Sequence, residues 1–379
     1  MKFQVLSSLL TSHLTALSRV LGSKSPMPIL DDFLFEITPD KLIVTASDGD
    51  TTMITNIEIT EVEGTGRFAI PAKTLLEPLN AMPQQTLTFV IDPGNLEVFV
   101  IYPNGKYNFI AQNADEYPKL KELDPAAHTF TISATALQNG INSTSFAVAN
   151  DEMRPMMNGI CFDIKHDSCT FVASNSKILV RLINKSVTAD FEESFIMCKK
   201  PATLLKSIIS KGMEDAEITF DDKSVRVKIG GYIISSSRIE GKFPRYEAVI
   251  PKNNTNIMTI DRLECINTTR RISVFASAAT NQVKFEIDKD QLIVSAQDVD
   301  YSLNGNEKIS CSYDSVPLQI GFRANYLIEM LNTMTSSEVE FQMSDSFRAC
   351  LIVPVENNEN EDLLMLIMPM QLADFGNPQ

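Results

Sequence analysis

Short runs of alternating apolar and polar residues recur along this chain, and three of them share one layout. Alternation with a period of two is typical of strands with one buried face. Each of the three runs is followed by a turn and a second run, which together predict a β-hairpin. The paired runs are 33–37 with 42–48, 160–164 with 170–175, and 283–287 with 292–298. Their central residues Phe35, Phe162 and Phe285 lie 127 and 123 residues apart, which indicates an internal repeat.

A second landmark recurs at nearly the same offsets from each hairpin. A short strand leads into a helix whose apolar residues are three and four apart, at 68–79, 196–209 and 320–331. Each copy also opens with a helix, predicted near Ser8–Leu21, Ala134–Ala149 and Arg262–Ala278. In the first of these helices, Leu9, Leu10, Leu14, Leu17 and Leu21 are expected to share one face.

The chain is therefore predicted to contain three similar α+β domains of about 120 residues, a usual domain size. Pro- and Asn-containing turns near Pro125 and Asn253 suggest the boundaries, so the predicted domains are 1–125, 126–252 and 253–379. Three related domains in one chain favour a pseudo-symmetric assembly, and two such chains would make a ring of six. The repeat alone does not give a function.

Composition supports a globular protein. Hydrophobic residues make up 44% of the 379 positions and charged residues 21%. No apolar run approaches the roughly 20 residues of a membrane-spanning helix, and the six cysteines stand singly, so a reducing, cytoplasmic location is expected. The net charge of −15 argues against nucleic-acid binding only weakly, because positive charge can gather on one surface.

The residues that could support catalysis form no recognisable constellation. The three histidines are far apart, and no phosphate-binding, zinc-protease or nucleophile-elbow motif is present. Pairs of acids such as Asp31–Asp32, Asp221–Asp222 and Glu361–Asp362 are expected to be solvated turn residues. Asp48, Asn175 and Asp298 occupy equivalent repeat positions, which favours a structural role in turns. We expect no enzyme activity, cofactor or metal.

Five motifs, in order along the chain, resemble the bacterial DNA polymerase III beta subunit (beta sliding clamp) family. The longest is Ser237–Tyr246 continued by Val249–Lys252, which resembles the family's G-[RK]-[FY]-P-x-Y…[IV]-P segment. The others are Met1–Phe3, Met27–Leu30, Arg154–Gly159 and Met368–Leu372, the last similar to the family ending M-P-[MI]-R-L. The resemblance covers Met1 to Leu372 without large gaps.

This resemblance implies a ring-shaped, head-to-tail homodimer whose helices line a central channel and whose antiparallel sheets lie outside. It implies a non-catalytic processivity factor that encircles double-stranded DNA and raises the effective concentration of a polymerase at the primer end. The implied partners are the DNA polymerase III alpha subunit, the clamp loader delta subunit and other proteins that carry a clamp-binding motif.

The resemblance also suggests which residues face DNA. The matching family positions are Lys24, Lys73, Asp151, Pro155 and Met156, although the family often has amide or aromatic residues at the last three. Basic residues on or beside the predicted helices are further candidates for weak phosphate contacts. These are Arg19, Lys199, Lys200, Lys206, Lys211, Arg270 and Arg271.

A partner-peptide pocket is implied between the second and third domains. Methionines and a few polar groups around an apolar groove suit peptide capture. The matching residues are Met157, Ser174, Ser176, Lys177, Ile178, Leu179, Pro244, Ala248, Val249, Arg323, Tyr326, Phe347, Met368, Pro369, Met370 and Leu372. The family's T-D-G-H-R-L is Ser174–Leu179 here, and its usual arginines are replaced by Ala248 and Gln371. We therefore expect an apolar groove that has lost cationic rim groups and prefers a different partner motif.

Two other interpretations remain open from the sequence. A repeat-built adaptor that never encloses DNA would scatter its basic residues over both faces. A metal-dependent nuclease would need three or four acids that converge at strand ends, and the sequence shows no such cluster.

Overall fold

The computed structural model describes residues 1–22 and 27–372, and the chain divides into two compact units. The first unit contains Met1–Gln138 and Lys200–Arg238, and the second contains Asn139–Lys199 and the residues from Ile239 onward. Among the described residues, no helix is long and apolar enough to cross a membrane.

The three predicted hairpins are present. They are β2 (Asp32–Ile37) with β3 (Lys41–Ser47), β12 (Gly159–Lys165) with β13 (Ser168–Ser174), and β20 (Gln282–Asp288) with β21 (Gln291–Asp298). Phe35, Phe162 and Phe285 are fully buried, and each contacts other phenylalanine rings. The apolar alternation thus marks the same core position in all three repeats.

The residues that follow the hairpins have the structural role predicted for them. In each repeat one side-chain oxygen accepts two backbone N–H groups of the next turn. Asp48 Oδ1 accepts from Asp50 and Thr51, at 3.0 and 2.7 Å. Asn175 and Asp298 bind the equivalent N–H groups in their own turns. This Asx turn reverses the chain into the next strand, so these positions are structural.

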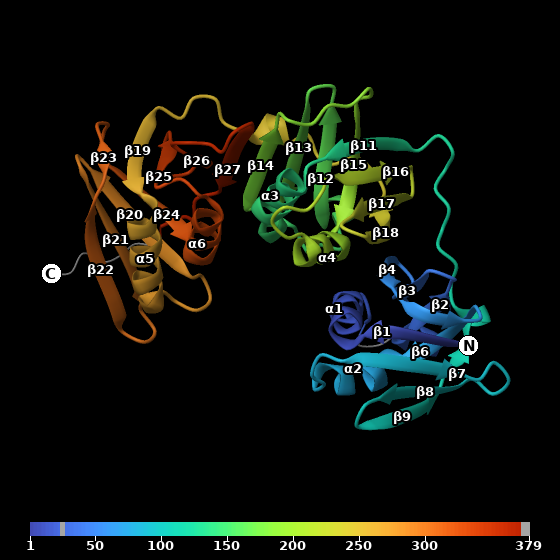
Figure 1. Cartoon of the computed structure of the whole chain (residues 1–379). Helices are drawn as coiled ribbons and strands as arrows, with labels where there is room; N and C mark the ends of the chain where they lie inside the picture. The colour runs from blue at the N-terminus through green and yellow to red at the C-terminus, as the bar shows by residue number, and fades with distance from the viewer. Residues whose placement is uncertain (23–26, 373–379) are drawn as a thin grey trace. The chain divides into compact units, whose positions relative to one another are not determined.

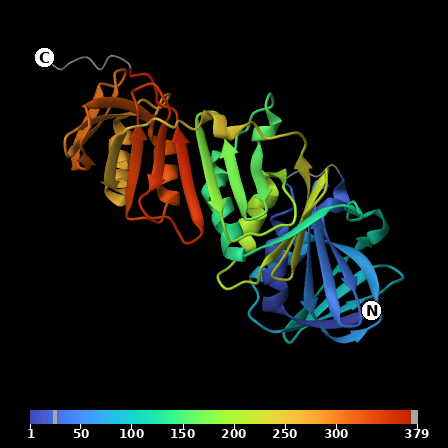
Figure 2. The same ribbon diagram turned by 90° about the horizontal axis from the view of Figure 1, so that it is seen from above.

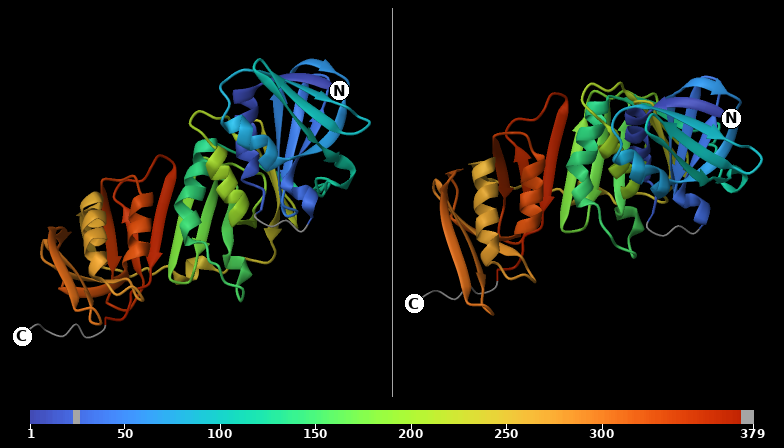
Figure 3. Two further views of the ribbon diagram at one scale, coloured as in Figure 1. Left: turned by 90° about the horizontal axis from the view of Figure 1, so that it is seen from below. Right: turned by 60° about the horizontal axis from the view of Figure 1, so that its bottom comes forward.

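The strand that leads into a helix also recurs three times. The pairs are β6 (Gly66–Pro71) with α2 (Ala72–Asn80), β15 (Glu193–Cys198) with α4 (Lys199–Ile208), and β24 (Leu318–Arg323) with α6 (Ala324–Thr333). The opening helices are α1 (Ser7–Ser18), α3 (Ala134–Thr144) and α5 (Arg262–Ile272). In the first repeat α1 contacts α2, and in the third α5 contacts α6 (Figures 1 and 3).

Helix α1 ends at Ser18 rather than near Leu21, and the last two opening helices are shortened further. A 3₁₀ turn follows each of them, η3 (Ser145–Ala147) and η6 (Ser273–Phe275). The next residues, Val148 and Ala276, have extended backbone conformations that cannot continue a helix. The apolar pattern runs on through these turns, which explains why it predicted longer helices.

The first unit contains two antiparallel sheets. One has the order β5-β1-β7-β8-β9, and the other has the order β11-β16-β17-β18-β4-β3-β2-β6-β10. Pairing of β18 with β4 joins strands of the first and second repeats. The remaining bounds are β1 (Lys2–Leu6), β4 (Thr51–Glu58), β5 (Thr60–Glu63), β7 (Thr86–Ile91), β8 (Glu97–Tyr102), β9 (Gly105–Ile110), β10 (Gln112–Asn113), β11 (His128–Ile132), β16 (Ala216–Phe220), β17 (Ser224–Ile229) and β18 (Tyr232–Ile239).

The second unit also contains two antiparallel sheets, with the orders β22-β21-β20-β24 and β15-β12-β13-β14-β27-β26-β25-β19-β23. Strand β14 runs beside β27, so one sheet continues from the second repeat into the third (Figure 2). The remaining bounds are β14 (Ile178–Asn184), β19 (Asn256–Asp261), β22 (Leu303–Ser310), β23 (Ser312–Tyr313), β25 (Glu338–Met343), β26 (Cys350–Pro354) and β27 (Glu361–Ile367).

One acid that was expected to be solvated is buried. Asp32, the first residue of β2, is 2% exposed, and its Oδ2 atom has no hydrogen-bond partner. Burial, and the nearby charge of Asp31, raise the pKa of Asp32 to about 6. The prediction was wrong for Asp32 because the 3₁₀ turn η1 (Pro28–Asp31) brings Ile29 and Leu30 into an apolar cluster with Tyr117.

Candidate functional site

Residues 240–252 link β18 to β19, and this connector is fixed to the sheet of the second unit. Phe243, Tyr246 and Ile250 pack against an apolar cluster that includes Leu179 of β14 and Leu366 of β27. Tyr246 also donates a hydrogen bond of 3.0 Å from its hydroxyl to Asp163 Oδ2. The connector therefore has a defined path, and the side chains between these anchors can line cavities on either side of it.

A mainly apolar cavity of about 440 Å³ lies along one side of the connector. We call it the groove. Its floor is buried, because Ile178, Leu179 and Leu366 are 1%, 3% and 4% exposed. The residues that line it are Arg154, Met157, Ser174, Ser176, Lys177, Ile178, Leu179, Phe243, Pro244, Arg245, Tyr246, Val249, Leu366 and Met368.

The backbone conformation around Ser176 fixes the position of the polar edge of the groove. Ser176 has a φ of +71°, a left-handed conformation that is uncommon for a residue other than glycine. It stands where the family motif has glycine, and the Asx turn of Asn175 fixes the residues beside it. The Met368 N–H donates to the Lys177 carbonyl at 2.8 Å, which brings the C-terminal segment to the groove.

The groove has more positive charge than the sequence predicted. Arg154, Lys177 and Arg245 all line it, and no acidic side chain does. Arg154 is also bound to Asp151, with an N–O distance of 2.7 Å. Arg154 and Arg245 were not predicted to line the groove, whereas the loss of cationic rim groups relative to the family stays a prediction. Position-by-position matching notes the missing arginines but cannot show that cations from separate segments converge.

Several residues predicted for this pocket lie elsewhere. Ala248 lines a different cavity, described below. Arg323, Tyr326, Phe347, Pro369, Met370 and Leu372 are not among the residues that line the groove. The Met370 N–H binds the Gly321 carbonyl at 2.8 Å, so the tail runs beside β24. The Arg323 guanidinium lies 5.7 Å from the Tyr326 ring centre, and Phe347 is 72% exposed.

Sequence reasoning missed four aromatic or charged groove residues, namely Arg154, Phe243, Arg245 and Tyr246. Phe243 and Tyr246 belong to the motif that carried the family resemblance, so the motif itself was a usable signal. Leu366 was interpreted partly as core, and it is both a core residue and part of the groove floor.

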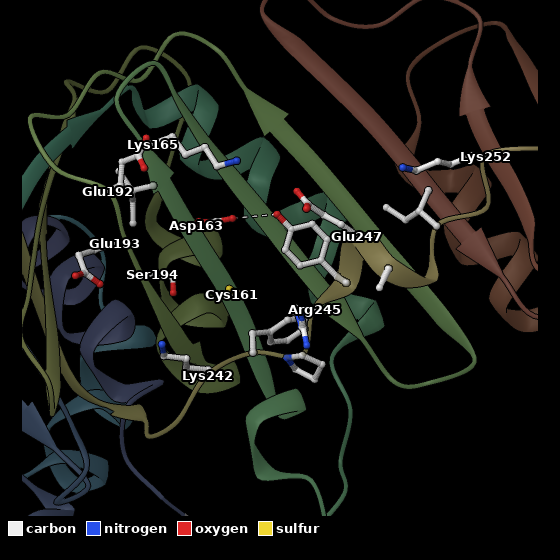
Figure 4. Close-up of a pocket in the computed structure, with 16 residues that line it drawn as sticks. Cys161, Asp163, Lys165, Glu192, Glu193, Ser194, Lys242, Arg245, Glu247 and Lys252 are labelled. Atoms are coloured by element: carbon white, nitrogen blue, oxygen red, sulfur yellow. Dashed lines mark hydrogen bonds between the residues drawn. The ribbon is translucent and has the colours of Figure 1, made fainter.

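A second cavity of about 900 Å³ lies along the other side of the connector (Figure 4). We call it the charged cavity. The two cavities share Phe243, Pro244, Arg245 and Tyr246 as lining residues. Four acidic and four basic side chains line the charged cavity, namely Asp163, Glu192, Glu193, Glu247, Lys165, Lys242, Arg245 and Lys252.

The Cys161 thiol also lines the charged cavity and is 3% exposed. Its burial, together with the nearby Asp163 charge, raises its pKa to about 12. The thiol is therefore protonated at neutral pH and is a poor nucleophile. All six cysteines lie in described residues, and none forms a disulfide.

The predicted DNA-facing residues are spread over several helices. Lys24 lies outside the described residues. Arg19 is the C-cap of α1, Lys73 lies on α2, Arg270 and Arg271 end α5, and Lys199, Lys200 and Lys206 lie on α4. Lys211 is exposed after α4. Several of these cations already have partners, since Lys200 binds Asp48, Arg271 binds Glu307 and Lys73 lies 3.8 Å from Glu77.

Helices α1 and α3 contain no Asp, Glu, Lys or Arg. Their exposed residues include Ser8, Ser12, Thr15 and Thr135. Positive charge is therefore found on α2, α4 and α5 and at the C-cap of α1, and hydroxyl groups are found along α1 and α3.

The loop predicted from the second repeat is centred on η4 (Pro155–Met157). Asp151 at its start is held by Arg154 and by the Met153 N–H, and these bonds lower the pKa of its carboxyl group. A charged carboxylate at this position would repel a phosphate rather than bind it. Pro155 is exposed and Met156 is half-buried on the same turn.

Comparison with known proteins shows the family. Models of the N-terminal, central and C-terminal domains of the DNA polymerase III beta subunit match residues 1–121, 131–245 and 247–371. The chain belongs to the DNA polymerase III beta subunit family. The predicted family, its three α+β clamp domains and its sliding-clamp function are confirmed.

The individual relatives match almost the whole length of the chain. It is similar to the beta sliding clamp of Haemophilus influenzae, with 25% identity over 98% of this chain and 100% of the relative. It is 25% identical to the beta sliding clamp of Synechocystis, over 99% of this chain and 100% of that one. Solved sliding clamps from Pseudomonas aeruginosa and Bacillus subtilis share the fold with TM-scores of 0.91, at 20% and 22% identity. Both cover 98% of this chain and 100% of their own.

The family consists of non-catalytic accessory subunits. Among the described residues, no group of three or more His, Cys, Asp or Glu side chains could hold a metal ion. The acids Glu361 and Asp362 were predicted to be solvated turn residues, but they are half-buried at the start of β27 and have side-chain partners, so that prediction was wrong. Glu361 accepts hydrogen bonds from Asn139 and Asn358, and Asp362 pairs with Arg181.

Proposed function

We propose that two copies of this chain close head to tail into a ring around duplex DNA and tether the DNA polymerase III alpha subunit to it. The observation that carries this proposal is the threefold repeat of one strand–helix unit, with an open strand edge in the first and in the third repeat. A closed ring retains DNA by enclosure, so the ring needs no tight phosphate contact. An acidic chain is compatible with that mode of retention.

The open edges belong to β9 and β22, which end their sheets and each pair with one neighbouring strand. An unpaired edge is a ready template for strand pairing between chains. Ile110 on β9 and Leu303 on β22 are 71% and 44% exposed, so each edge also offers an apolar side chain. We infer that β9 of one copy pairs with β22 of the other.

The DNA contacts in this proposal are weak and independent of sequence. Lys73, Arg19, Lys199, Lys206 and Arg270 supply the positive charge. Each phosphate contact that releases a counterion makes binding more dependent on salt. Because α1 and α3 contain no charged side chain, we expect the rate of sliding along DNA to depend only weakly on salt concentration.

The groove is the proposed site for a short apolar segment of the alpha subunit, of the clamp loader delta subunit and of other clamp-motif proteins. Its buried apolar floor and its Met157 and Met368 side chains suit segments that vary in sequence. The proposal places the protein in the cytoplasm, assigns it no catalytic residues and keeps 1–125, 126–252 and 253–379 as its three domains.

The first test is retention on DNA. The protein is loaded onto nicked circular plasmid by a clamp loader from the same genome, freed from unbound protein, and the plasmid is then cut once. We expect retention on the circle and rapid loss after cutting. Equal retention on circular and linear DNA would mean ordinary affinity binding. Retention on neither, with a loader that loads a related clamp in parallel, would favour a protein-binding adaptor.

The dimer is tested separately. Ile110→Asp and Leu303→Asp each place a charge on one proposed edge, and we expect each to shift dimer to monomer in analytical ultracentrifugation. Val355→Asp is the matched control, because Val355 is 45% exposed and follows β26, which pairs with β25 and β27 rather than with either edge strand. A dimer unaffected by both edge variants would contradict the proposed pairing.

A further inference from the structure

We propose that the charged cavity is a second binding compartment, which holds the charged segment that flanks the apolar anchor of a partner protein. In this arrangement an acidic residue of the partner lies nearest the groove, and a basic residue lies farther along. The inference rests on the proposed function of the groove and specifies which partner segments it prefers.

The first argument is continuity. Phe243, Pro244, Arg245 and Tyr246 line both cavities, so only this short stretch of the connector separates them. A peptide that leaves the groove over this stretch enters the charged cavity. Extended peptide advances about 3.3 Å per residue, so a handful of residues reaches well into it.

The second argument is the stability of the shared wall. Phe243 and Tyr246 pack against the apolar cluster below the connector, and the Tyr246 hydroxyl is bound to Asp163 in the floor of the charged cavity. Between them, Pro244 and Arg245 are exposed. The cavities therefore have a preformed boundary, which lowers the entropy cost of binding a peptide across it.

The third argument is the distribution of charge. Arg245 and Lys242 stand on the connector, whereas Glu192 and Glu193 rise from the start of β15 and the residue before it (Figure 4). Arg245 also lines the groove, which has no acidic side chain. Glu247 also stands on the connector, and Lys165 lies beside Glu192. Cations therefore outnumber acids on the connector, and acids outnumber cations on the opposite wall. The excess charge away from the groove is cationic and then acidic, and the complementary peptide is acidic and then basic.

These charges are available to a partner. No ion pair joins any of the eight charged residues of this cavity to another described residue. Glu192, Glu193 and Lys242 are exposed, so they can pair with a ligand without breaking an existing bridge. Exposed charge pairs add modest affinity and mainly determine which partner is chosen.

The test uses peptides from the alpha subunit encoded by the same genome. The short probe is the shortest alpha segment that competes with full-length alpha for the clamp, and the long probes add eight native residues on one side or the other. We expect one long probe to bind about three- to tenfold more tightly than the short probe at low salt, the range expected for exposed charge pairs. A gain from neither long probe would overturn the proposal.

Variants of the clamp then test which residues produce the extra affinity of the long probe. Lys242→Glu and the double variant Glu192→Lys/Glu193→Lys alter residues that line only the charged cavity. We expect each to remove the gain of the long probe and to leave the short probe unchanged. Lys289→Glu and Glu359→Lys reverse exposed charges outside both cavities and are the matched controls. A gain that persists in both cavity variants would place the flanking segment elsewhere.

Reversing one charge on the peptide and one on the clamp tests whether the lost affinity is recovered. A long probe whose flanking acidic residue is changed to lysine should lose the gain on the native clamp and recover it on the Lys242→Glu variant. No recovery would contradict the proposed acidic contact. Failure of this inference can be told apart from failure of the groove assignment. If the groove binds the apolar anchor, Val249→Asp weakens binding of the short probe by about thirtyfold or more, whether or not the flanking residues add affinity.

Discussion

On one side of the connector, the groove has a floor of buried leucine and isoleucine. On the other, the charged cavity has four acids and four bases and about twice the volume, about 900 against 440 Å³. Removing apolar surface from water supplies affinity for many partners, whereas exposed charges contribute little energy and discriminate between partners. Two adjacent sites on one fixed segment can thus separate how tightly a partner binds from which partner binds.

The largest effect should come from a charge in the groove. Val249 lines the groove and is 58% exposed, so Val249→Asp adds a carboxylate there without opening the core. Burying that carboxylate under an apolar peptide is costly, and we expect affinity for the alpha subunit to fall by about thirtyfold or more, the size of a hot-spot loss of about 2 kcal/mol. Isothermal titration calorimetry measures the change.

The neighbouring residue provides the control for that prediction. Ala248 is exposed and lines only the charged cavity, so Ala248→Asp adds the same group on the other side of the connector. We expect its effect on the short alpha peptide to stay within about twofold, as for a typical surface substitution. Equal losses in the two variants would mean that the cavities do not act separately.

A smaller effect should come from salt. The Debye length falls from about 10 Å at 0.1 M to about 3 Å at 1 M salt, so exposed charge pairs lose most of their attraction. Raising the salt across this range should weaken the favoured long peptide by about fivefold, which is about 1 kcal/mol. The short peptide should change little. If both peptides weaken equally, the groove itself binds through charge.

The smallest effect should come from the bond that fixes the connector. Tyr246→Phe removes the hydroxyl that binds Asp163 and should lower the free energy of unfolding by about 1 kcal/mol at pH 7. Burial, and then the Asp163 charge, raise the pKa of Tyr246 above its usual 10. The stability contributed by neutral Tyr246 is therefore present below pH 10 and is lost as the pH rises above it.

Urea unfolding at pH 7 and at pH 10.5 checks this prediction. The difference in free energy of unfolding between the unsubstituted protein and Tyr246→Phe should shrink at the higher pH. At that pH Tyr246 ionises in the unfolded chain, which stabilises the unfolded state of the unsubstituted protein. A difference that is constant with pH would mean that Tyr246 contributes by packing alone.

The repeat could be predicted from sequence because its signals are local. Phe35, Phe162 and Phe285 mark the same buried position, and Asp48, Asn175 and Asp298 form the same Asx turn. These features depend on alternation and on contacts two or three residues along the chain. Helix ends were less predictable, since the apolar pattern continues through η3 and η6 although the backbone does not remain helical.

The candidate site was only partly predictable because it depends on contacts between distant segments. Motif matching found Met157, Ile178, Val249 and Met368, which do line the groove. It could not show that Arg245 and Arg154 approach the same cavity, nor that Ala248 faces away from its neighbour Val249. The burial of Asp32 was missed for the same reason, since its apolar neighbours include Tyr117, far along the chain.

Strand β27 is the last strand of the described residues, and it pairs with β14 through seven residue pairs from Ile178–Ile367 to Asn184–Glu361. It supplies Leu366 to the groove floor and leads directly into Met368. During synthesis the groove therefore cannot form until nearly the whole described chain has left the ribosome. Partners that require a complete groove therefore cannot use it until β27 has paired with β14.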